Sequence, residues 1–362
     1  MDQRRILLLI TDLELGGTPT VVRELAVRLR RDVAAAHVEV ACLSKWGPVA
    51  TQLQEAGVTV TALDAKGVAD LGIVARLIRF LHGRKFDTVF SFLVHANTVA
   101  AMASVSVRDI RWIQAIQTTQ PWPRWHWLAQ GVAQLAADAV VVPSPSVAAA
   151  GKEWSRIPAE KIVVIPNAID LADYPPASPD RSKEASEEFA IAFIGRLDPI
   201  KDVPMLVEAM ARLAPQDDRV RLHIYGDGPD RGRIEGAIAK EGLQQRVTLH
   251  GSIDRPQTAL SKSDLLVLPS LAEGFGLVLI EAMAAGVPVI ATDVGGIRDV
   301  VRANETGLLV PPGNPALLTS AIQRTIEDPA LRQRLIANAA ADVRDRFAWD
   351  RVLPQYRALL RL

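Results

Sequence analysis

Short apolar runs, many of them rich in β-branched residues, alternate along the chain with longer stretches whose apolar residues recur at helical spacing. The first run covers residues 6–11 and is followed by a glycine-containing loop and an amphipathic stretch at 19–31. Such alternation predicts a parallel sheet covered by helices on both faces. Further strands are predicted in the first half at HVEVACL, VTVTALD, DTVFSFL, IRWIQAI, AVVVPS and KIVVIPN.

The composition changes between Asp170 and Glu188, where proline, serine and charged residues predict a linker. A second series of strands follows at FAIAFIGRL, VRLHIYGDG, RVTLHG, LLVLPS, VPVIAT and GLLVP. The fold class expected is therefore α/β, with two doubly wound parallel-sheet domains at residues 1–180 and 181–346. Ligands of such sheets bind beyond the carboxyl ends of the strands, so the site is expected in a cleft where the two domains face each other.

Composition and charge exclude several classes of protein. The 41 basic and 41 acidic residues balance without a basic stripe, which argues against nucleic acid as a partner. Cys42 is the single cysteine and lies in an apolar run, so we expect it in the core and the protein in a reducing cytoplasm. The opening RRILLLIT is too short for a signal peptide, and no segment is long and apolar enough to span a bilayer.

Two cations follow the first strand of the second half, in the segment GRLDPIKD. Arg196 and Lys201 there suit a polyanion, although a pair of solvated surface charges is an equally simple interpretation. The next strand is followed by GDGPDR, in which Gly226 and Gly228 permit a tight turn and close backbone approach. This is not the dinucleotide fingerprint, because Arg231 stands where a third glycine is needed.

The most informative stretch is SLAEGFGLVLIEAMAAGVPVIAT, which places two glutamates in an apolar setting. A helix is predicted to begin near Gly276–Leu277, leaving Glu273 in the loop before it and Glu281 about one turn inside it. Free amides at a helix start bind anions, and carboxylates accept hydrogen bonds from hydroxyls. An anion flanked by two sets of hydroxyls describes a nucleoside diphosphate sugar, whereas the alternative is that each glutamate forms a structural ion pair.

In the first half, the loop DLELGGT follows the first strand, and its Gly16 and Gly17 can bring backbone amides close to a phosphate. A plain turn would explain the same two residues. His95 follows the strand DTVFSFL and so also lies at a carboxyl end, where a structural role is as common as a functional one.

These motifs together resemble the retaining, nucleotide-sugar-dependent glycosyltransferases of the GT-B fold, specifically family 4. The resemblance rests on GRLDPIKD, YGDGPDR, EGFGLVLIE, AMAAGVPVIATDVGGIRDVV and TGLLVPPGNP, and covers about residues 189–330. The first half is similar more loosely, through GGTPTVVRELA, HANTVAA, ADAVVVPSPSVA and VIPNAID. The resemblance implies an acceptor-side first domain, a donor-binding second domain, and a terminal helix at about 347–362 that packs back on the first.

The resemblance also implies a role for each matching residue. Arg196 and Lys201 would bind the donor diphosphate, Glu281 the ribose hydroxyls and Glu273 the transferred sugar, which His95 would approach. The catalytic set would be Glu273, Arg196, Lys201 and His95. The donor-binding set would be Gly16, Gly17, Gly195, Arg196, Lys201, Gly226, Gly228, Gly251, Ile253, Glu273, Phe275, Gly276, Leu277 and Glu281.

Such enzymes are generally metal-independent, so no cofactor is expected beside the nucleotide diphosphate sugar that serves as co-substrate. Cations would stabilise the leaving diphosphate, with departure and attack on the same face of the sugar. The chain departs from the family at Arg298 and Asp299, where Pro-Glu is common. The rival hypotheses are a GT-B-fold sugar-nucleotide 2-epimerase and a non-catalytic nucleotide-sugar binding protein.

The acceptor is expected to be a glycan or a lipid-linked glycan in polysaccharide or glycolipid synthesis. The segment QPWPRWHWLAQ is dense in tryptophan, and Trp125 and Trp127 are expected to lie exposed near the acceptor. Tryptophan stacks on sugars and also prefers membrane interfaces, so a peripheral contact with the cytoplasmic face of the membrane is a further expectation. Ordinary core packing is the competing interpretation.

Overall fold

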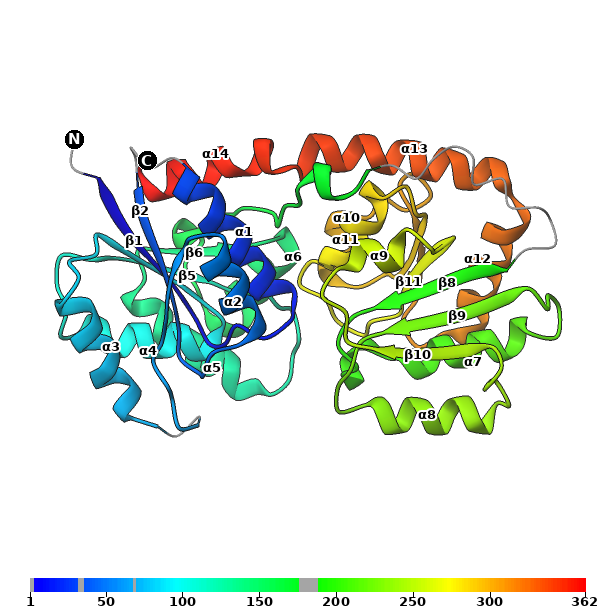
Figure 1. The fold of residues 1–362 in the computed structure, drawn as a ribbon, viewed down its shortest axis with the longest axis horizontal. Helices are drawn as coiled ribbons and strands as arrows, with labels where there is room; N and C mark the ends of the chain where they lie inside the picture. The colour runs from blue at the N-terminus through cyan, green and yellow to red at the C-terminus, as the bar shows by residue number, and fades with distance from the viewer. Residues whose placement is uncertain (1–2, 32–35, 68–69, 176–187) are drawn as a thin grey trace. The chain divides into compact units, whose positions relative to one another are not determined.

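The computed structural model describes residues 3–31, 36–67, 70–175 and 188–362. The chain divides into two compact units, Met1–Asn167 with Asp350–Leu362, and Ala168–Trp349 (Figure 1). Most of the predicted linker, residues 176–187, lies outside the described residues. Across the described ranges, no helix combines the length and hydropathy needed to cross a membrane.

The first unit is built on a seven-stranded sheet in which every pairing is parallel. All predicted strands of this half are present; the five central strands are largely buried, and the two edge strands are partly exposed. Cys42 is fully buried, and burial raises the pKa of its thiol to about 11, which fits the predicted core role. The elements are β1 (Arg4–Ile10), α1 (Gly17–Arg31), β2 (Ala36–Cys42), α2 (Pro48–Glu55), β3 (Thr59–Ala62), α3 (Gly72–His82), β4 (Thr88–Phe92), α4 (Val94–Ser104), β5 (Arg111–Ala115), α5 (Arg124–Ala133), η1 (Gln134–Ala136), β6 (Ala139–Val142), α6 (Pro145–Ser155), η2 (Ala159–Lys161), β7 (Ile162–Val164) and, from the end of the chain, α14 (Trp349–Leu360).

Helix α14 returns to the first unit through an aromatic contact and a hydrogen bond. The buried ring of Tyr356 lies with its centroid 6.3 Å from that of Phe90 on β4. The Arg111 guanidinium at the start of β5 donates to the carbonyl of Leu359. These contacts explain why residues 350–362 belong to the first unit although they end the chain.

The second unit is built on a six-stranded sheet that is also parallel throughout. Helices α7, α8 and α12 pack together, as do α9, α10 and α13, so that the sheet is covered on two faces. The parallel, doubly wound prediction is confirmed for both units. The elements are η3 (Leu171–Asp173), β8 (Phe189–Ile194), η4 (Pro199–Lys201), α7 (Val203–Leu213), β9 (Val220–Tyr225), α8 (Arg231–Lys240), β10 (Val247–Gly251), α9 (Pro256–Leu260), β11 (Leu265–Leu268), α10 (Leu277–Ala284), β12 (Val289–Thr292), α11 (Gly295–Val300), β13 (Leu308–Val310), α12 (Pro315–Glu327) and α13 (Pro329–Arg346).

The strand order reverses once in each sheet. β1 lies between β2 and β4 in the first, and β8 lies between β9 and β11 in the second. The reversal lies between β1 and β4 in the first sheet and between β8 and β11 in the second. In folds of this kind, the helices that follow two such strands pack on opposite faces of the sheet, and ligands bind between the loops at the carboxyl edge. In the second unit, the loops after β8 and β11 carry Arg196 and Glu273.

Close backbone contact holds the loops at this edge together. A Cβ built at Gly226, after β9, would lie 1.8 Å from the carbonyl oxygen of Gly195, after β8. A Cβ at Gly296, after β12, would lie 2.0 Å from the carbonyl oxygen of Gly274, after β11. Both distances are far below van der Waals contact, so only glycine lets these loops approach.

We expect Gly226→Ala to destabilise the second unit, because its φ of 151° is rarely adopted by other residues and the new methyl group would overlap a backbone oxygen. Backbone strain alone costs about 1–3 kcal/mol. Gly232→Ala on α8 is the matched control, since its Cβ would meet no atom within 4 Å. Urea unfolding followed by circular dichroism should show a lower midpoint for Gly226→Ala only; equal midpoints would contradict the argument.

Candidate active site

An ion pair joins the segments that follow β8 and β11 in the second unit. The Lys201 ammonium, at the end of η4, donates to Oε1 of Glu273 in the loop between β11 and α10. Both side chains are largely buried, at 22 % and 12 % exposed. The loops are also joined by the backbone amide of Leu271, which donates to the carbonyl of Ile200 at 2.8 Å. Lys201 and Glu273 are therefore brought together at the place where a ligand of this fold is expected.

Glu273 is held by a hydroxyl as well as by the lysine. Oγ of Ser270, which is fully buried, donates to Oε1 of Glu273 at 2.9 Å. The ion-pair alternative left open by the sequence thus holds for Glu273 in combination with a hydroxyl partner. Ser270 was not among the predicted residues, although its place directly after LLVLP at the strand end was a signal that could have found it.

Helix α10 begins at Leu277, after Gly276 in the left-handed region at φ 80°, as the sequence predicted. Glu281 lies in this helix and is 6 % exposed. Phe275, in the turn before it, is buried, and its ring contacts Phe347 edge to face with centroids 5.4 Å apart. The packing of Phe275 fixes the turn that presents the first amides of α10.

The remaining predicted donor residues of this unit lie on the neighbouring loops. Arg196 is exposed, at 72 % for its side chain, with its Nε 4.0 Å from a carboxylate oxygen of Asp198. Gly195 donates through its amide to Tyr225, and Gly226 donates to Gly251 at 2.7 Å, which ties the ends of β8, β9 and β10 together. The last three, Gly228, Ile253 and Leu277, are partly buried.

At the departure from the family pattern, Arg298 is exposed and paired with Asp293. Its Nη2 donates to the Asp293 carbonyl at 2.9 Å, and its guanidinium also contacts the Asp293 carboxylate. That pairing, more than any other cause, raises the pKa of Arg298 above its ordinary value. Arg298 therefore forms a surface ion pair near the start of α11, while Gly296, two residues before it, keeps the contact with Gly274.

In the first unit, the predicted residues follow the two strands that flank its own reversal. Gly16 and Gly17 lie at the start of α1, exposed, with the amide of Thr20 donating to the Gly16 carbonyl at 3.1 Å. His95 is the second residue of α4, directly after β4. Leu93, the residue before this helix, has φ 73° and ψ 152°, a backbone conformation that residues other than glycine rarely adopt. Such strain is common at functional sites.

His95 lies in a cluster of rings with Trp125 and His126. Its centroid is 5.6 Å from Trp125 and 5.7 Å from His126, both edge to face. Burial, and to a lesser extent His95, lowers the pKa of His126 below its ordinary value and favours the neutral imidazole. Trp125 is 51 % exposed, as expected for a residue that borders a ligand. His126 was not among the predicted site residues.

Trp127 is not exposed, and the expectation that it lies at the surface beside Trp125 is wrong. Its side chain is 5 % exposed, its ring is 4.9 Å from that of Trp154, and its Nε1 donates to the Gln120 carbonyl at 2.9 Å. Residues two positions apart in a helix point to nearly opposite sides of it, so Trp125 and Trp127 on α5 cannot share one surface. Trp127 belongs to the core.

A buried polar network, which the sequence analysis missed, sets the orientation of α5. The Asn97 amide donates to the Ala115 carbonyl at 2.9 Å and to Oε1 of Gln130 at 2.8 Å. Gln130 donates in turn to Oε1 of Gln114 at 2.7 Å, and Ser91 donates to Oδ1 of Asn97 at 2.7 Å. These side chains join β4, β5, α4 and α5, and so position His95 relative to Trp125.

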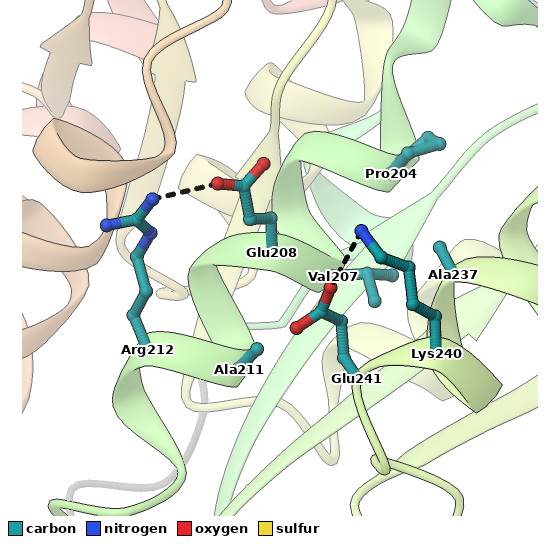
Figure 2. Close-up of a pocket in the computed structure, with 8 residues that line it drawn as sticks. All are labelled: Pro204, Val207, Glu208, Ala211, Arg212, Ala237, Lys240 and Glu241. Atoms are coloured by element: carbon teal, nitrogen blue, oxygen red, sulfur yellow. Dashed lines mark hydrogen bonds and ion pairs between the residues drawn. The ribbon is translucent and has the colours of Figure 1, made fainter.

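A pocket of about 460 Å³ lies between α7 and α8 (Figure 2). Its charged side chains are paired with neighbours in sequence, Arg212 with Glu208 at 2.8 Å and Lys240 with Glu241 at 3.5 Å. None of its lining residues is a predicted site residue. In the part of the chain that the structure describes, no group of three or more His, Cys, Asp or Glu residues is arranged to hold a metal ion.

The two parallel, doubly wound units define an α/β protein. Comparison with known proteins identifies its family. The profile of the family Glycosyl transferases group 1 matches residues 176–342, and that of Glycosyltransferase Family 4 matches residues 15–173. HepE of Anabaena, solved in complex with UDP and glucose, superposes over 99 % of both chains with a TM-score of 0.88 and 24 % identity, which shows the fold. The chain belongs to the group 1 glycosyltransferases of the GT-B fold.

Curated relatives match over part of their length. D-inositol 3-phosphate glycosyltransferase of Jonesia denitrificans is 36 % identical over 53 % of this chain and 49 % of its own. Alpha-D-kanosaminyltransferase of Streptomyces kanamyceticus is 35 % identical over 41 % of this chain and 39 % of its own. The chain thus spans half or less of the length of these two relatives.

We expect Trp127→Ala to lower the free energy of unfolding by about 3–5 kcal/mol, because it empties a packed site beside Trp154 and removes a hydrogen bond. Trp125→Ala, on the exposed side of the same helix, should change it by about 0.5 kcal/mol or less. Urea unfolding of the two variants measures the difference. Similar losses for both would mean that Trp125 also packs in the core.

Proposed function

We propose that the chain transfers a sugar, with retention of anomeric configuration, from a nucleotide diphosphate sugar to a hydroxyl of a glycan or lipid-linked glycan. The observation that carries this proposal is the Lys201–Glu273 pair at the strand reversal, beside the start of α10. It combines a cation, a carboxylate and the first amides of a helix at the carboxyl edge of the second sheet. Few ligands other than a diphosphate bearing hydroxyl groups need all three.

The donor is recognised in two halves. The amides at the start of α10, with Lys201 and the exposed Arg196, bind the diphosphate. Glu281, inside the helix, accepts hydrogen bonds from the ribose, while Glu273 accepts from the hydroxyls of the sugar to be transferred. The ion pair to Lys201 holds the Glu273 carboxylate in position before the sugar arrives.

Transfer follows departure and attack on the same face of the sugar. The bond between the anomeric carbon and the diphosphate oxygen breaks, and Lys201, Arg196 and the helix amides stabilise the charge on the leaving group. The acceptor hydroxyl attacks from the side that the diphosphate leaves, and its proton passes to a diphosphate oxygen. Glu273 contributes positioning, and His95, Gly16 and Gly17 keep the roles that the family resemblance implies for them.

The names of the relatives support a nucleotide-sugar donor and leave the acceptor open. HepE was solved with UDP and glucose, and the two curated relatives are named for an inositol phosphate acceptor and for a transferred kanosamine. On this chain, Trp125 beside His95 and His126 is the candidate acceptor surface, since an exposed ring can stack on a sugar. We place the product in polysaccharide or glycolipid synthesis.

Incubation with a panel of nucleotide sugars separates the candidate activities. A transferase without acceptor releases free nucleotide slowly by hydrolysis, a 2-epimerase yields the isomerised sugar nucleotide, and a binding protein does neither. Free nucleotide is the outcome we expect, because the cations that stabilise a leaving diphosphate are present.

Glu281→Ala and Glu273→Ala should have different effects. Loss of hydrogen bonds to a charged group costs about 1.5–3 kcal/mol. Glu281→Ala should therefore weaken the binding of free nucleotide diphosphate about tenfold or more. Glu273→Ala should keep nucleotide affinity, since it frees the Lys201 ammonium, but reduce transfer by a similar factor. Calorimetry and product analysis give the two readouts, with the exposed Glu305→Ala as control. Equal losses of nucleotide affinity in both variants would refute the assignment.

Nucleotide binding should not require a divalent metal, because Arg196 and Lys201 supply the positive charge for the diphosphate. Calorimetric titration of UDP, GDP and ADP in the presence of EDTA, and again with excess Mg²⁺ or Mn²⁺, measures this. We expect dissociation constants that agree within about threefold, which corresponds to less than 1 kcal/mol. Binding that occurs only with metal would overturn the prediction.

A further inference from the structure

Helix α5 exposes several large apolar side chains and buries a glutamine. Five large apolar side chains recur every three or four residues from the segment just before α5 to the end of η1, and all are exposed: Trp122 (60 %), Trp125 (51 %), Leu128 (69 %), Val132 (70 %) and Leu135 (72 %). We call them the α5 apolar stripe. Surface helices normally present the opposite pattern, with apolar residues facing the core. Contiguous exposed apolar residues mark interaction surfaces.

The inward side of α5 explains why the helix cannot rotate to bury this stripe. Gln130 is 3 % exposed and bonded to Asn97 and Gln114 within the buried network. On the same side, the Trp127 carbonyl accepts from Oγ of Ser155 at 2.7 Å. Turning α5 would leave several buried polar groups without hydrogen-bond partners, which is unfavourable. The outward direction of the stripe is therefore fixed by the fold.

The segments that carry the stripe contain no acidic residue, and the nearest acids in the sequence are the exposed Asp109 and Asp138. Residues 94–108, which include α4, and residues 110–137, which include β5 and α5, contain no aspartate or glutamate. Arg124, at the start of α5, is exposed, with its guanidinium carbon 4.6 Å from the centroid of the Trp122 ring. Two further apolar residues, Met102 of α4 and Val105 directly after it, are exposed, and α4 packs against α5 and η1.

We propose that the α5 apolar stripe docks the first unit onto the surface of a lipid bilayer that contains anionic lipids. A helix that lies in the interface inserts one apolar row among the acyl chains, places tryptophan at the headgroups and extends arginine to the phosphates. Leu128, Val132 and Leu135 supply the row, while Trp122, Trp125 and Arg124 supply the interfacial groups. The lack of acids on α4 and α5 removes the repulsion that an anionic surface would otherwise exert.

A second copy of the chain suits this surface less well. A stable protein interface uses about 20–30 residues on each side, whereas the stripe is one row of five with Met102 and Val105 beside it. A bilayer needs no complementary partner face, so a single row is sufficient. The inference goes beyond the proposed transfer reaction and does not depend on it, because docking can be measured without donor or acceptor.

The test is co-sedimentation of the full chain with large unilamellar vesicles of phosphatidylcholine, with or without 30 % phosphatidylglycerol (about one lipid in three, enough to make the surface anionic). We expect binding to the mixed vesicles, a blue shift of tryptophan emission, and at least a tenfold loss of partitioning in Leu128→Glu/Val132→Glu. Both positions are about 70 % exposed and lie outside the candidate site, so the variant should fold normally by circular dichroism. Leu71→Glu/Leu317→Glu, at exposed leucines elsewhere, is the matched control and should bind like the natural protein.

Three results would overturn the proposal. The first is a natural protein that sediments with neither vesicle, and the second is an α5 variant that binds as well as the control. The third is a dimer by sedimentation velocity that the α5 substitutions dissociate while vesicle binding is absent, since a second copy would then cover the stripe. Each result leaves the nucleotide-sugar assays unaffected, so failure of docking is distinguishable from failure of the proposed transfer.

Discussion

Direct contact between backbones at the carboxyl edge of the second sheet is the constraint on which the candidate site depends. The loops after β8 and β9 meet at Gly195 and Gly226, and those after β11 and β12 meet at Gly274 and Gly296, with no side chain between them. Because the loops support one another, residues 72 apart in the sequence can form an ion pair at the strand reversal. A larger side chain at these contacts would separate the loops and, with them, the cation and carboxylate of the site.

The Lys201–Glu273 pair explains how a largely buried carboxylate is compatible with a site for an anionic ligand. An unpaired carboxylate there would be costly and would repel a diphosphate, whereas a lysine ammonium carries three donors and can bond the carboxylate while still offering donors to another anion. Ser270 provides a second bond to Glu273 and fixes its orientation. The pair is therefore at once a structural ion pair and a prepared binding group, and the two interpretations of Glu273 do not exclude each other.

Much of this could be predicted from the sequence, because the signals were local. Each apolar run became a strand, and Gly276 was enough to locate the start of α10. The burial of Trp127 could not be predicted in the same way. Which side of α5 faces inward depends on Gln130 bonding to Asn97 and Gln114, partners 33 and 16 residues away. Hydrophobicity alone favours burial of every tryptophan on α5, and only the polar network decides between Trp125 and Trp127.

That network also links the two features that distinguish the first unit. By joining α4 and α5 to β5, it holds His95 beside Trp125 and His126 at the carboxyl edge, and the same bonds point Leu128 and Val132 toward solvent. A fold selected only for stability would have no reason to bury glutamine and expose leucine on one helix, since each exposed apolar side chain forgoes about 1.5–3 kcal/mol of burial. The arrangement is understandable if the outward side of α5 has a partner of its own, one that lies beside the surface where His95 and Trp125 present their rings.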